Sequence, residues 1–177
     1  MHAIMEKQED ELNLNKEDVK LVTLAGLCHD LGHGPFSHLF DNHVMRNLYP
    51  ELNWTHEQAS TELIDLIVDR EAVDLDQTDI GTIKNFIVGE NRFKSSLNSD
   101  QSKELVTVEW MYEIISNERN KIDVDKFDYI RRDPLMAGFK AAGYESAILI
   151  NGARVMENQI CYPSKSANHV YDLFISR

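Results

Sequence analysis

The sequence has few cysteines, few basic residues and no long apolar run, and each shortage excludes a class of protein. Only Cys28 and Cys161 are cysteines, and they lie far apart without a C-x-x-C spacing, which excludes a disulfide framework and a structural zinc knuckle. The 18 Lys and Arg residues against 30 Asp and Glu give a net charge of −12. Such a charge argues against a basic footprint for duplex nucleic acid, while a local basic pocket and other nucleic-acid affinity stay open.

Membrane and secretory signals are also missing. No stretch approaches the roughly 18–20 consecutive apolar residues that cross a bilayer. The acidic N-terminal region lacks the basic-then-apolar layout of a signal peptide. We therefore expect a soluble intracellular protein, in the nucleus or the cytoplasm, with no membrane partner.

Hydrophobic residues make up 42% of the 177 positions, enough for one compact domain with its own core. They recur mostly at helical spacing, and Gly, Pro, Asn and Ser separate the runs, so the predicted fold is mainly α. We expect helices over residues 16–31, 37–48, 55–73, around 80–87, 105–115, 123–132 and 168–177. Residues 1–145 are thus mostly helical in this prediction, with a polar surface loop, free of catalytic residues, at 89–102.

A small β ribbon is predicted near the C-terminus, over about residues 146–163. Three short β-like runs lie at 148–150, 153–156 and 159–162. Two turn-forming pairs, Asn151-Gly152 and Glu157-Asn158, separate them.

Capping and stop signals define several predicted helix ends. Asn15 can cap the helix that follows it, and Thr55 with Gln58 forms a capping box. Pro134 disfavours helical backbone at Asp133, so the helix at 123–132 should end there. The expected buried side of the helix at 55–73 consists of Ala59, Leu63, Leu66 and Ile67.

Five of the seven histidines fall within 28 residues: His29, His33, His38, His43 and His56. In a helix, His29 and His33 would share one face, and Asp30 could reach the same metal ion only near the helix end. Imidazole nitrogens with a carboxylate oxygen suit Mn, Fe, Zn or, with more oxygen ligands, Mg. We expect Gly32, Gly34 and Pro35 to shape the backbone here, and His43, His2 and His169 to be surface residues.

Two ligands alone do not hold a catalytic ion, so a further carboxylate is needed. The acidic segment at 123–128 is its predicted source, through Asp123, Asp125 or Asp128. Only one of these three has to face inward, and Asp123 and Asp128 are better explained as a helix cap or surface charges.

Three strings together resemble the HD-domain phosphohydrolases: LCHDLGHGPFSH at 27–38, WTHEQ at 54–58 and IDVDKFDY at 122–129. Within that family the resemblance is strongest to the vertebrate dNTP triphosphohydrolases that combine a sterile-alpha-motif domain with an HD domain. It covers nearly the whole chain, and it implies a helical HD-domain core.

The resemblance implies roles for particular residues. His29 and Asp30 match the doublet that binds a divalent metal ion, and Asp125 matches the distant aspartate that completes that side of the ion. The residues matching those near the scissile phosphate are His33, Asp41 and His56, with His56 as the proton donor to the leaving group. The residues matching the substrate-binding positions are His38, Lys126, Tyr129, Asp133 and Arg177, of which Lys126 and Arg177 hold the triphosphate.

Residue spacing agrees with part of this assignment independently. Asp125, Tyr129 and Asp133 are four residues apart, and Lys126 lies three before Tyr129. In a helix, this spacing presents a ligand, a cation, a ring and a carboxylate on one face.

The implied reaction is metal-dependent hydrolysis of a dNTP to deoxynucleoside and inorganic triphosphate. Attack falls on the α-phosphorus, and a sugar against Tyr129 leaves little space for a 2′ hydroxyl. The resemblance also implies a homo-oligomer activated by GTP or dNTP, and a part in dNTP catabolism and antiviral defence. Pro163 stands where an arginine of the activator segment is expected, although Lys165 remains, so we expect altered or lost activation.

The family signature H…HD…D places one more histidine some tens of residues before His29, where only 28 residues precede it. We expect a fragment of a longer enzyme or a short form of it. A catalytically impaired nucleotide-binding or interaction module is the alternative. A third alternative, a hydrolase of cyclic nucleotides or nucleoside monophosphates, is disfavoured because Lys126 and Arg177 both suit a triphosphate.

Overall fold

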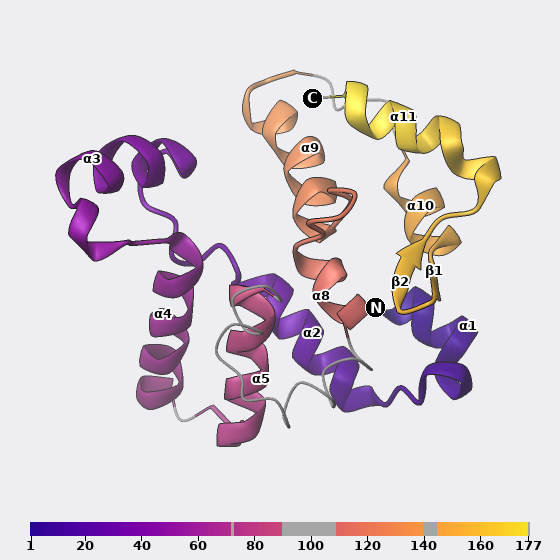
Figure 1. Cartoon of the computed structure of the whole chain (residues 1–177), viewed down its shortest axis with the longest axis horizontal. Coiled ribbons are helices and arrows are strands. Elements are labelled where there is room, and N and C mark those ends of the chain that lie inside the picture. The colour runs from indigo at the N-terminus through magenta and orange to yellow at the C-terminus, as the bar shows by residue number, and fades with distance from the viewer. Residues whose placement is uncertain (72, 90–108, 140–144, 177) are drawn as a thin grey trace. The chain divides into compact units, whose positions relative to one another are not determined.

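The structure is a computed structural model that describes residues 1–71, 73–89, 109–139 and 145–176. Helices dominate these residues, and one two-stranded antiparallel sheet lies near the C-terminus (Figure 1). The helices are α1 (His2–Leu12), α2 (Lys16–Cys28), α3 (Arg46–Leu48), α4 (His56–Glu71), α5 (Gln77–Val88), α8 (Glu109–Ile115), α9 (Val124–Met136), α10 (Ser146–Gly152) and α11 (Ala167–Ile175). Tighter or wider helical turns are η1 (Phe40–Met45), η2 (Pro50–Leu52) and η3 (Ser164–Ser166), and the strands are β1 (Arg154–Met156) and β2 (Gln159–Cys161).

The predicted fold class, mainly α with a small β ribbon, is confirmed. Within the described ranges, no helix combines the length and the apolar character needed to cross a membrane. The polar loop predicted at 89–102 lies outside the described residues except for Gly89, and so does the start of the helix predicted at 105–115.

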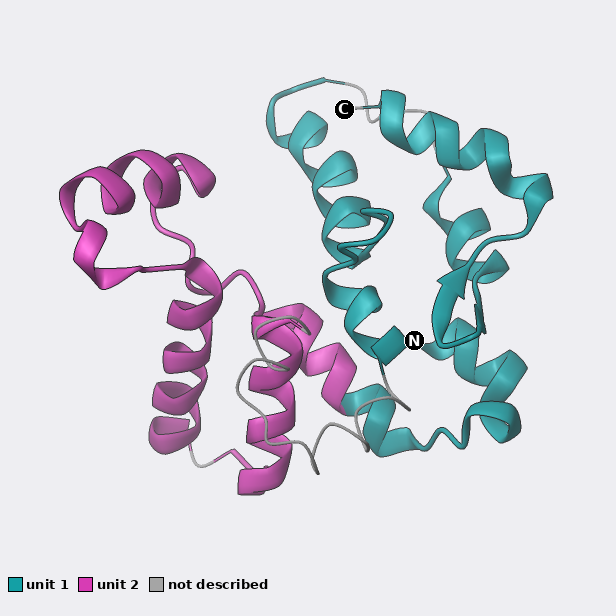
Figure 2. Cartoon of the chain, viewed as in Figure 1, with its two compact units in different colours: residues 1–20, 98–177 teal, residues 21–97 magenta. Residues whose placement is uncertain are grey.

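The chain forms two compact units (Figure 2). Unit 1 contains residues 1–20 and 98–177, and unit 2 contains residues 21–97. The core of unit 1 is built by Ile122, Ile130, Leu149 and Leu173, against which Phe127, Tyr129, Tyr162 and Val170 pack. In unit 2, α4 packs along α5, and the two helices bury Ile64, Ile80, Ile83, Phe86 and Ile87. The apolar pattern predicted around 80–87 is therefore confirmed.

Side-chain caps begin several helices where the sequence predicts them. Asn15 Oδ1, Thr55 Oγ1 and Asp123 Oδ1 accept hydrogen bonds from the backbone N–H groups of Asp18, Gln58 and Lys126, at 3.0, 3.3 and 2.9 Å. Each cap satisfies an N–H group that has no partner inside its own helix. The expectation that Asp123 is a cap is confirmed, and Asp128 is ion-paired with Arg132 at 2.7 Å on the surface of α9.

The helix predicted at 16–31 is three residues too long, because α2 ends at Cys28. Two turns follow, in which the N–H groups of Leu31 and His33 bond to the carbonyls of Cys28 and Asp30, three residues back. His29 and His33 therefore do not share a helix face, and that expectation is wrong.

The helix predicted at 123–132 is too short. Helix α9 continues through Pro134 to Met136, and the N–H of Ala137 still bonds to the Asp133 carbonyl at 2.9 Å. Pro134 lacks only the N–H that would bond to the Ile130 carbonyl, and it lies close to the end of the helix, so a single bond is lost.

The first of the three β-like runs is also wrong. Residues 148–150 belong to α10, in which Leu149 is fully buried while Ile148 and Ile150 are partly exposed. Burial of one residue between two exposed ones fits a helical turn as well as a strand over so short a run. The N–H of Ala153 bonds to the Leu149 carbonyl at 2.9 Å, which makes the segment helical.

The ribbon itself forms as predicted from the other two runs. Val155 pairs with Ile160, and the connecting residues Glu157 and Asn158 have φ of 50° and 60°, as a two-residue hairpin turn with positive φ at both positions requires. Helix α1, which the sequence analysis did not predict, packs beside β1. Its Gln8 side chain accepts from the Val155 N–H at 2.8 Å and donates to the Val155 carbonyl at 3.0 Å, so it takes the place of a third strand.

The exposed and buried faces of α4 differ from the prediction. Its buried residues are Ser60 and Ile64, whereas Leu63, Leu66 and Ile67 are exposed. The buried side is therefore displaced by one residue from the predicted one. The polar residue Ser60 is buried in place of Ala59, and Ile64 in place of Leu63.

Tyr162 in unit 1 makes stability depend on alkaline pH. Burial, with the negative charges of Asp123 and Glu113, raises the pKa of Tyr162 to about 12. Below pH 10 the phenol is protonated in both states, and above pH 10 the unfolded chain loses a proton that the folded chain keeps, so the free energy of unfolding falls. We expect urea melts to show a loss of about 2 kcal/mol between pH 10 and pH 12 that is absent in Tyr162→Phe. Equal losses in the two proteins would contradict this origin.

Candidate active site in unit 2

The loop between α2 and η1 comes extremely close to α4 at Gly32 and to the Phe40 ring at Gly34. A Cβ atom on Gly32 would overlap the His56 carbonyl oxygen and the Ser60 nitrogen, and one on Gly34 would overlap the Phe40 ring. Both glycines are therefore required by space, which confirms that they shape the backbone. Phe36 and Ser37 follow with φ of 67° and 51°, an uncommon conformation for residues with side chains, and one that often marks functional sites.

Ser60 holds this loop to α4. Its hydroxyl donates to the His29 carbonyl at 2.6 Å and accepts from the Gly32 N–H at 2.9 Å, and the residue is fully buried. The sequence analysis missed this residue. A small polar residue on the otherwise apolar side of a helix is the signal that could have found it.

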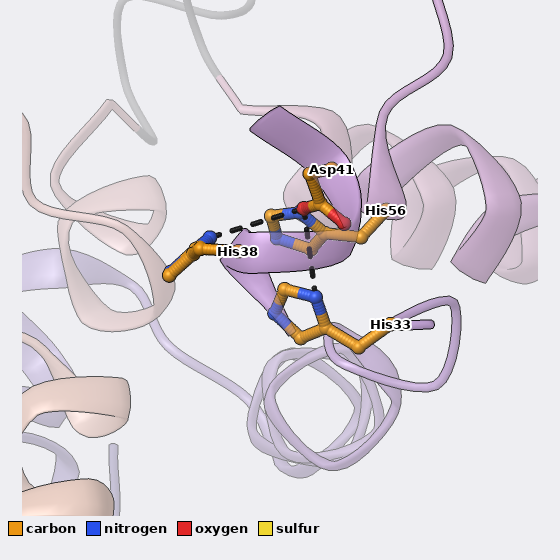
Figure 3. Close-up of side chains that lie close together, drawn as sticks. All are labelled: His33, His38, Asp41 and His56. Carbon is orange, nitrogen blue, oxygen red and sulfur yellow. Dashed lines mark hydrogen bonds and ion pairs between the residues drawn. The ribbon is translucent and has the colours of Figure 1, made fainter. Parts of the chain in front are cut away.

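Four side chains gather where the loop, η1 and α4 meet: His33, His38, Asp41 and His56 (Figure 3). His56 is the first residue of α4, and its Nδ1 lies 2.8 Å from Asp41 Oδ2. His33 Nδ1 and His38 Nδ1 lie 3.6 and 3.8 Å from the same oxygen. All three rings thus turn a nitrogen toward one carboxylate oxygen.

The cluster is buried on one side and open on the other. The side chains of Asp41, His33 and His56 are 13%, 15% and 15% exposed, whereas that of His38 is 73% exposed. The rings of His33 and His56 stack with centroids 3.8 Å apart. His43, from the same helical stretch as Asp41, is exposed, as predicted for a surface residue.

His33 is held in its neutral form. Burial lowers the pKa of its imidazole, and the neighbouring His56 ring lowers it further, against the opposing effect of Asp30 and Asp41. Two positive charges on rings stacked at 3.8 Å would repel each other, which favours the neutral form of His33.

Helix α9 in unit 1 carries three of the predicted substrate-binding residues, Lys126, Tyr129 and Asp133, whereas His38 belongs to the cluster in unit 2. Lys126 Nζ donates to Tyr129 Oη at 2.9 Å and lies 5.1 Å from the centre of the Phe174 ring, a neighbour that the sequence analysis missed. Asp133 is exposed on the same helix, with an ion pair to Arg132 at 3.1 Å. Arg177 lies outside the described residues.

The family assignment follows from comparison with known proteins. The profile of the HD domain family matches residues 1–130, which is most of the chain. The chain belongs to the HD domain family. The matched range includes His29, Asp30, His33, Asp41 and His56.

Several known proteins are similar to this HD-domain chain over nearly all its length. It is 38% identical over 191 residues to the deoxynucleoside triphosphate triphosphohydrolase SAMHD1 of Homo sapiens, covering 100% of this chain and 30% of that protein. It is 36% identical over 170 residues to the SAMHD1 homolog of Dictyostelium discoideum, covering 96% of this chain and 30% of that protein. The chain therefore spans about a third of the length of these relatives.

The doublet of the HD domain lies in the turn after α2. His29 Nδ1 donates to the Gly26 carbonyl at 2.7 Å, which fixes the tautomer with the lone pair on Nε2. His29 Nε2 and His33 Nε2 lie 3.2 and 3.5 Å from Asp30 Oδ1. In a helix, the side chains of consecutive residues point about 100° apart. Because α2 ends at Cys28, this restriction does not apply to His29 and Asp30.

This nitrogen and oxygen donor pair fits a divalent ion, and a side chain oriented by a backbone carbonyl is typical of a metal-binding histidine. Asp125 is a residue of α9 in unit 1. Its convergence with His29 and Asp30 stays a prediction.

Proposed function

We propose that this HD-domain chain carries catalytic residues of a metal-dependent dNTP triphosphohydrolase, which splits a dNTP into deoxynucleoside and inorganic triphosphate. The observation that carries the proposal is the Asp41 to His56 contact at 2.8 Å with His33 stacked beside it. The activity printed in the names of the relatives, shared over nearly the whole of this chain, supports the choice of reaction.

His56 is the proton donor in this proposal. Its Nδ1–H donates to Asp41, so the carboxylate orients the ring and stabilises the imidazolium while Nε2 delivers a proton to the leaving 5′ oxygen. His33, held neutral beside it, stacks against the ring and fixes its position. His38, exposed at the open side, binds a phosphate oxygen of the incoming substrate in this proposal.

The proposed ligands of the divalent ion are His29, Asp30 and Asp125. Such an ion, when bound, neutralises phosphate charge and lowers the pKa of a water molecule that attacks the α-phosphorus. The metal can be Mn, Fe, Zn or Mg on the basis of these ligand types.

The remaining roles come from the resemblance and stay proposals. Lys126 and Arg177 would hold the triphosphate, and Tyr129 with Asp133 would contact the deoxyribose. The hydrogen bond between Lys126 and Tyr129 supports their acting as one group. A homo-oligomer and an activating GTP or dNTP are part of the same proposal.

The direct test is to incubate the purified chain with Mn²⁺ and dGTP and to separate the products by ion-exchange chromatography. Inorganic triphosphate with deoxyguanosine supports the proposal, provided that a His29→Ala, Asp30→Ala variant yields neither. Pyrophosphate with dGMP would place the attack on another phosphorus and overturn the reaction proposed. Binding of dGTP without any product would favour a nucleotide-binding module instead.

A further inference from the structure

The four-residue cluster of unit 2 has a geometry that the proposed proton transfer does not require. Acid catalysis by His56 needs one carboxylate partner, yet three imidazole nitrogens surround Asp41 Oδ2, at 2.8, 3.6 and 3.8 Å. The four ligand atoms all lie within 4.8 Å of one another. Around a tetrahedral ion with bonds of about 2.0 Å, neighbouring ligand atoms are roughly 3.3 Å apart. The three distances to Asp41 Oδ2 lie on both sides of that value, so these donor atoms are already spaced nearly as a tetrahedral ion requires.

Buried atoms in the cluster lack partners that a cation would supply. Among the described residues, His33 Nδ1 and Asp41 Oδ1 are buried side-chain atoms without a hydrogen bond. A buried acceptor left unpaired is costly, and a native structure that tolerates two at one place commonly uses them for binding. A divalent ion between the rings would take the lone pair of His33 Nδ1, and bidentate binding by the Asp41 carboxylate would also give Oδ1 a partner.

Three of the side chains are fixed and the fourth can adjust. The close approach of the Gly32 loop to α4 positions His33 and His56, and Asp41 is nearly buried between them. His38 is largely exposed, so its ring can rotate into place without disturbing packing. Three nitrogens and one oxygen form a donor set well suited to Zn²⁺, and one less suited to Mg²⁺, which prefers oxygen ligands and octahedral geometry.

We propose that His33, His38, Asp41 and His56 form a binding site for a divalent transition-metal ion such as Zn²⁺, separate from the site proposed at His29 and Asp30. Binding replaces the proton on His56 Nδ1, which passes to solvent, with the metal bond. The ion then occupies the nitrogen that faces Asp41, so the ring can no longer cycle through its imidazolium form. Metal binding at this site does not depend on the proposed function, but under that function the ion is an inhibitor.

The test uses Co²⁺ as a spectroscopic probe, because a tetrahedral Co²⁺ complex absorbs visible light far more strongly than an octahedral one. The whole chain is titrated in a His29→Ala, Asp30→Ala background, which removes the doublet as a competing site. We expect one Co²⁺ per chain with a tetrahedral spectrum that Zn²⁺ abolishes by displacement. His38→Ala, at an exposed position, should weaken binding about tenfold, and Asp41→Asn by more. His43→Ala is the matched control, because it removes an exposed histidine of the same helical stretch, and it should bind as the background does.

Circular dichroism of each variant shows whether the fold is retained. The proposal is overturned if the folded background binds no Co²⁺, if the bound ion has an octahedral spectrum, or if His38→Ala and His43→Ala bind equally well. Lack of triphosphate release from dGTP would count against the proposed function alone, since the spectra report binding without turnover.

Discussion

Replacing His56 by alanine is expected to slow the release of inorganic triphosphate from dGTP by about 10²- to 10⁴-fold, the usual contribution of a general acid. The ring that bonds to Asp41 at 2.8 Å would be gone, while α4 can still begin, because the Thr55 cap does not involve the His56 side chain. The loss should appear in kcat, since His56 acts on the leaving group and not on substrate affinity. Initial rates over a range of dGTP concentrations measure it.

The matched control is His43→Ala, which removes an exposed imidazole from the same helical stretch. Its rate should stay close to that of the parent chain. Asp41→Asn should retain the shape of the cluster but lose the charge that stabilises the imidazolium, so its rate should fall below that of the parent. A His56→Ala protein with unchanged kcat would remove His56 from the mechanism.

Gly32→Ala is expected to lower the free energy of unfolding by about 3 kcal/mol, at the upper end of what overpacking usually costs. The added Cβ would overlap backbone atoms of His56 and Ser60, which cannot rotate away as a side chain could. The loop must then retreat from α4, and the two hydrogen bonds of Ser60 lengthen or break. Urea unfolding measures the loss, and activity should fall as well because His33 moves with the loop.

Gly81→Ala is the control, because a Cβ on Gly81 of α5 meets no atom within 4 Å. In a helix interior, alanine is preferred to glycine, so this change should raise the free energy of unfolding by about 0.5–1 kcal/mol. If the two substitutions change the free energy of unfolding in opposite directions, the space around each glycine determines the effect, and not the loss of a glycine as such. Equal effects would contradict the close approach of the loop to α4.

Local sequence signals predict where helices begin better than where they end. The caps at Asn15, Thr55 and Asp123 depend on neighbouring residues alone, and all three form. The ends of α2 and α9 do not follow from such local signals. Helix α2 ends at Cys28, just before the His29 carbonyl that accepts from Ser60, 31 residues along the chain, and no local pattern contains that partner. Helix α9 passes Pro134 because one missing bond is too small a loss to stop it.

The candidate site could be predicted as a set of residues but not as a geometry. The resemblance carried by the strings at 27–38 and 54–58 implies His33, Asp41 and His56 as site residues, and the structure brings these three together. The convergence of three ring nitrogens on a single oxygen of Asp41 depends on how the loop crosses α4, which is a tertiary property. Phe174 beside Lys126 is missed for the same reason, because 48 positions separate the two residues.

The wide winding of η1 makes the number of residues between Asp41 and Arg46 matter more than their types. The N–H of Arg46 bonds to the Asp41 carbonyl five residues back, so this turn contains one residue more than an α-helical turn. Deleting a single residue between Asp41 and Arg46 would let ordinary winding return and rotate the preceding residues by about 100° about the axis. Asp41 would then point away from His56. Related sequences should therefore vary in residue type at positions 42–45 more readily than in the number of residues there.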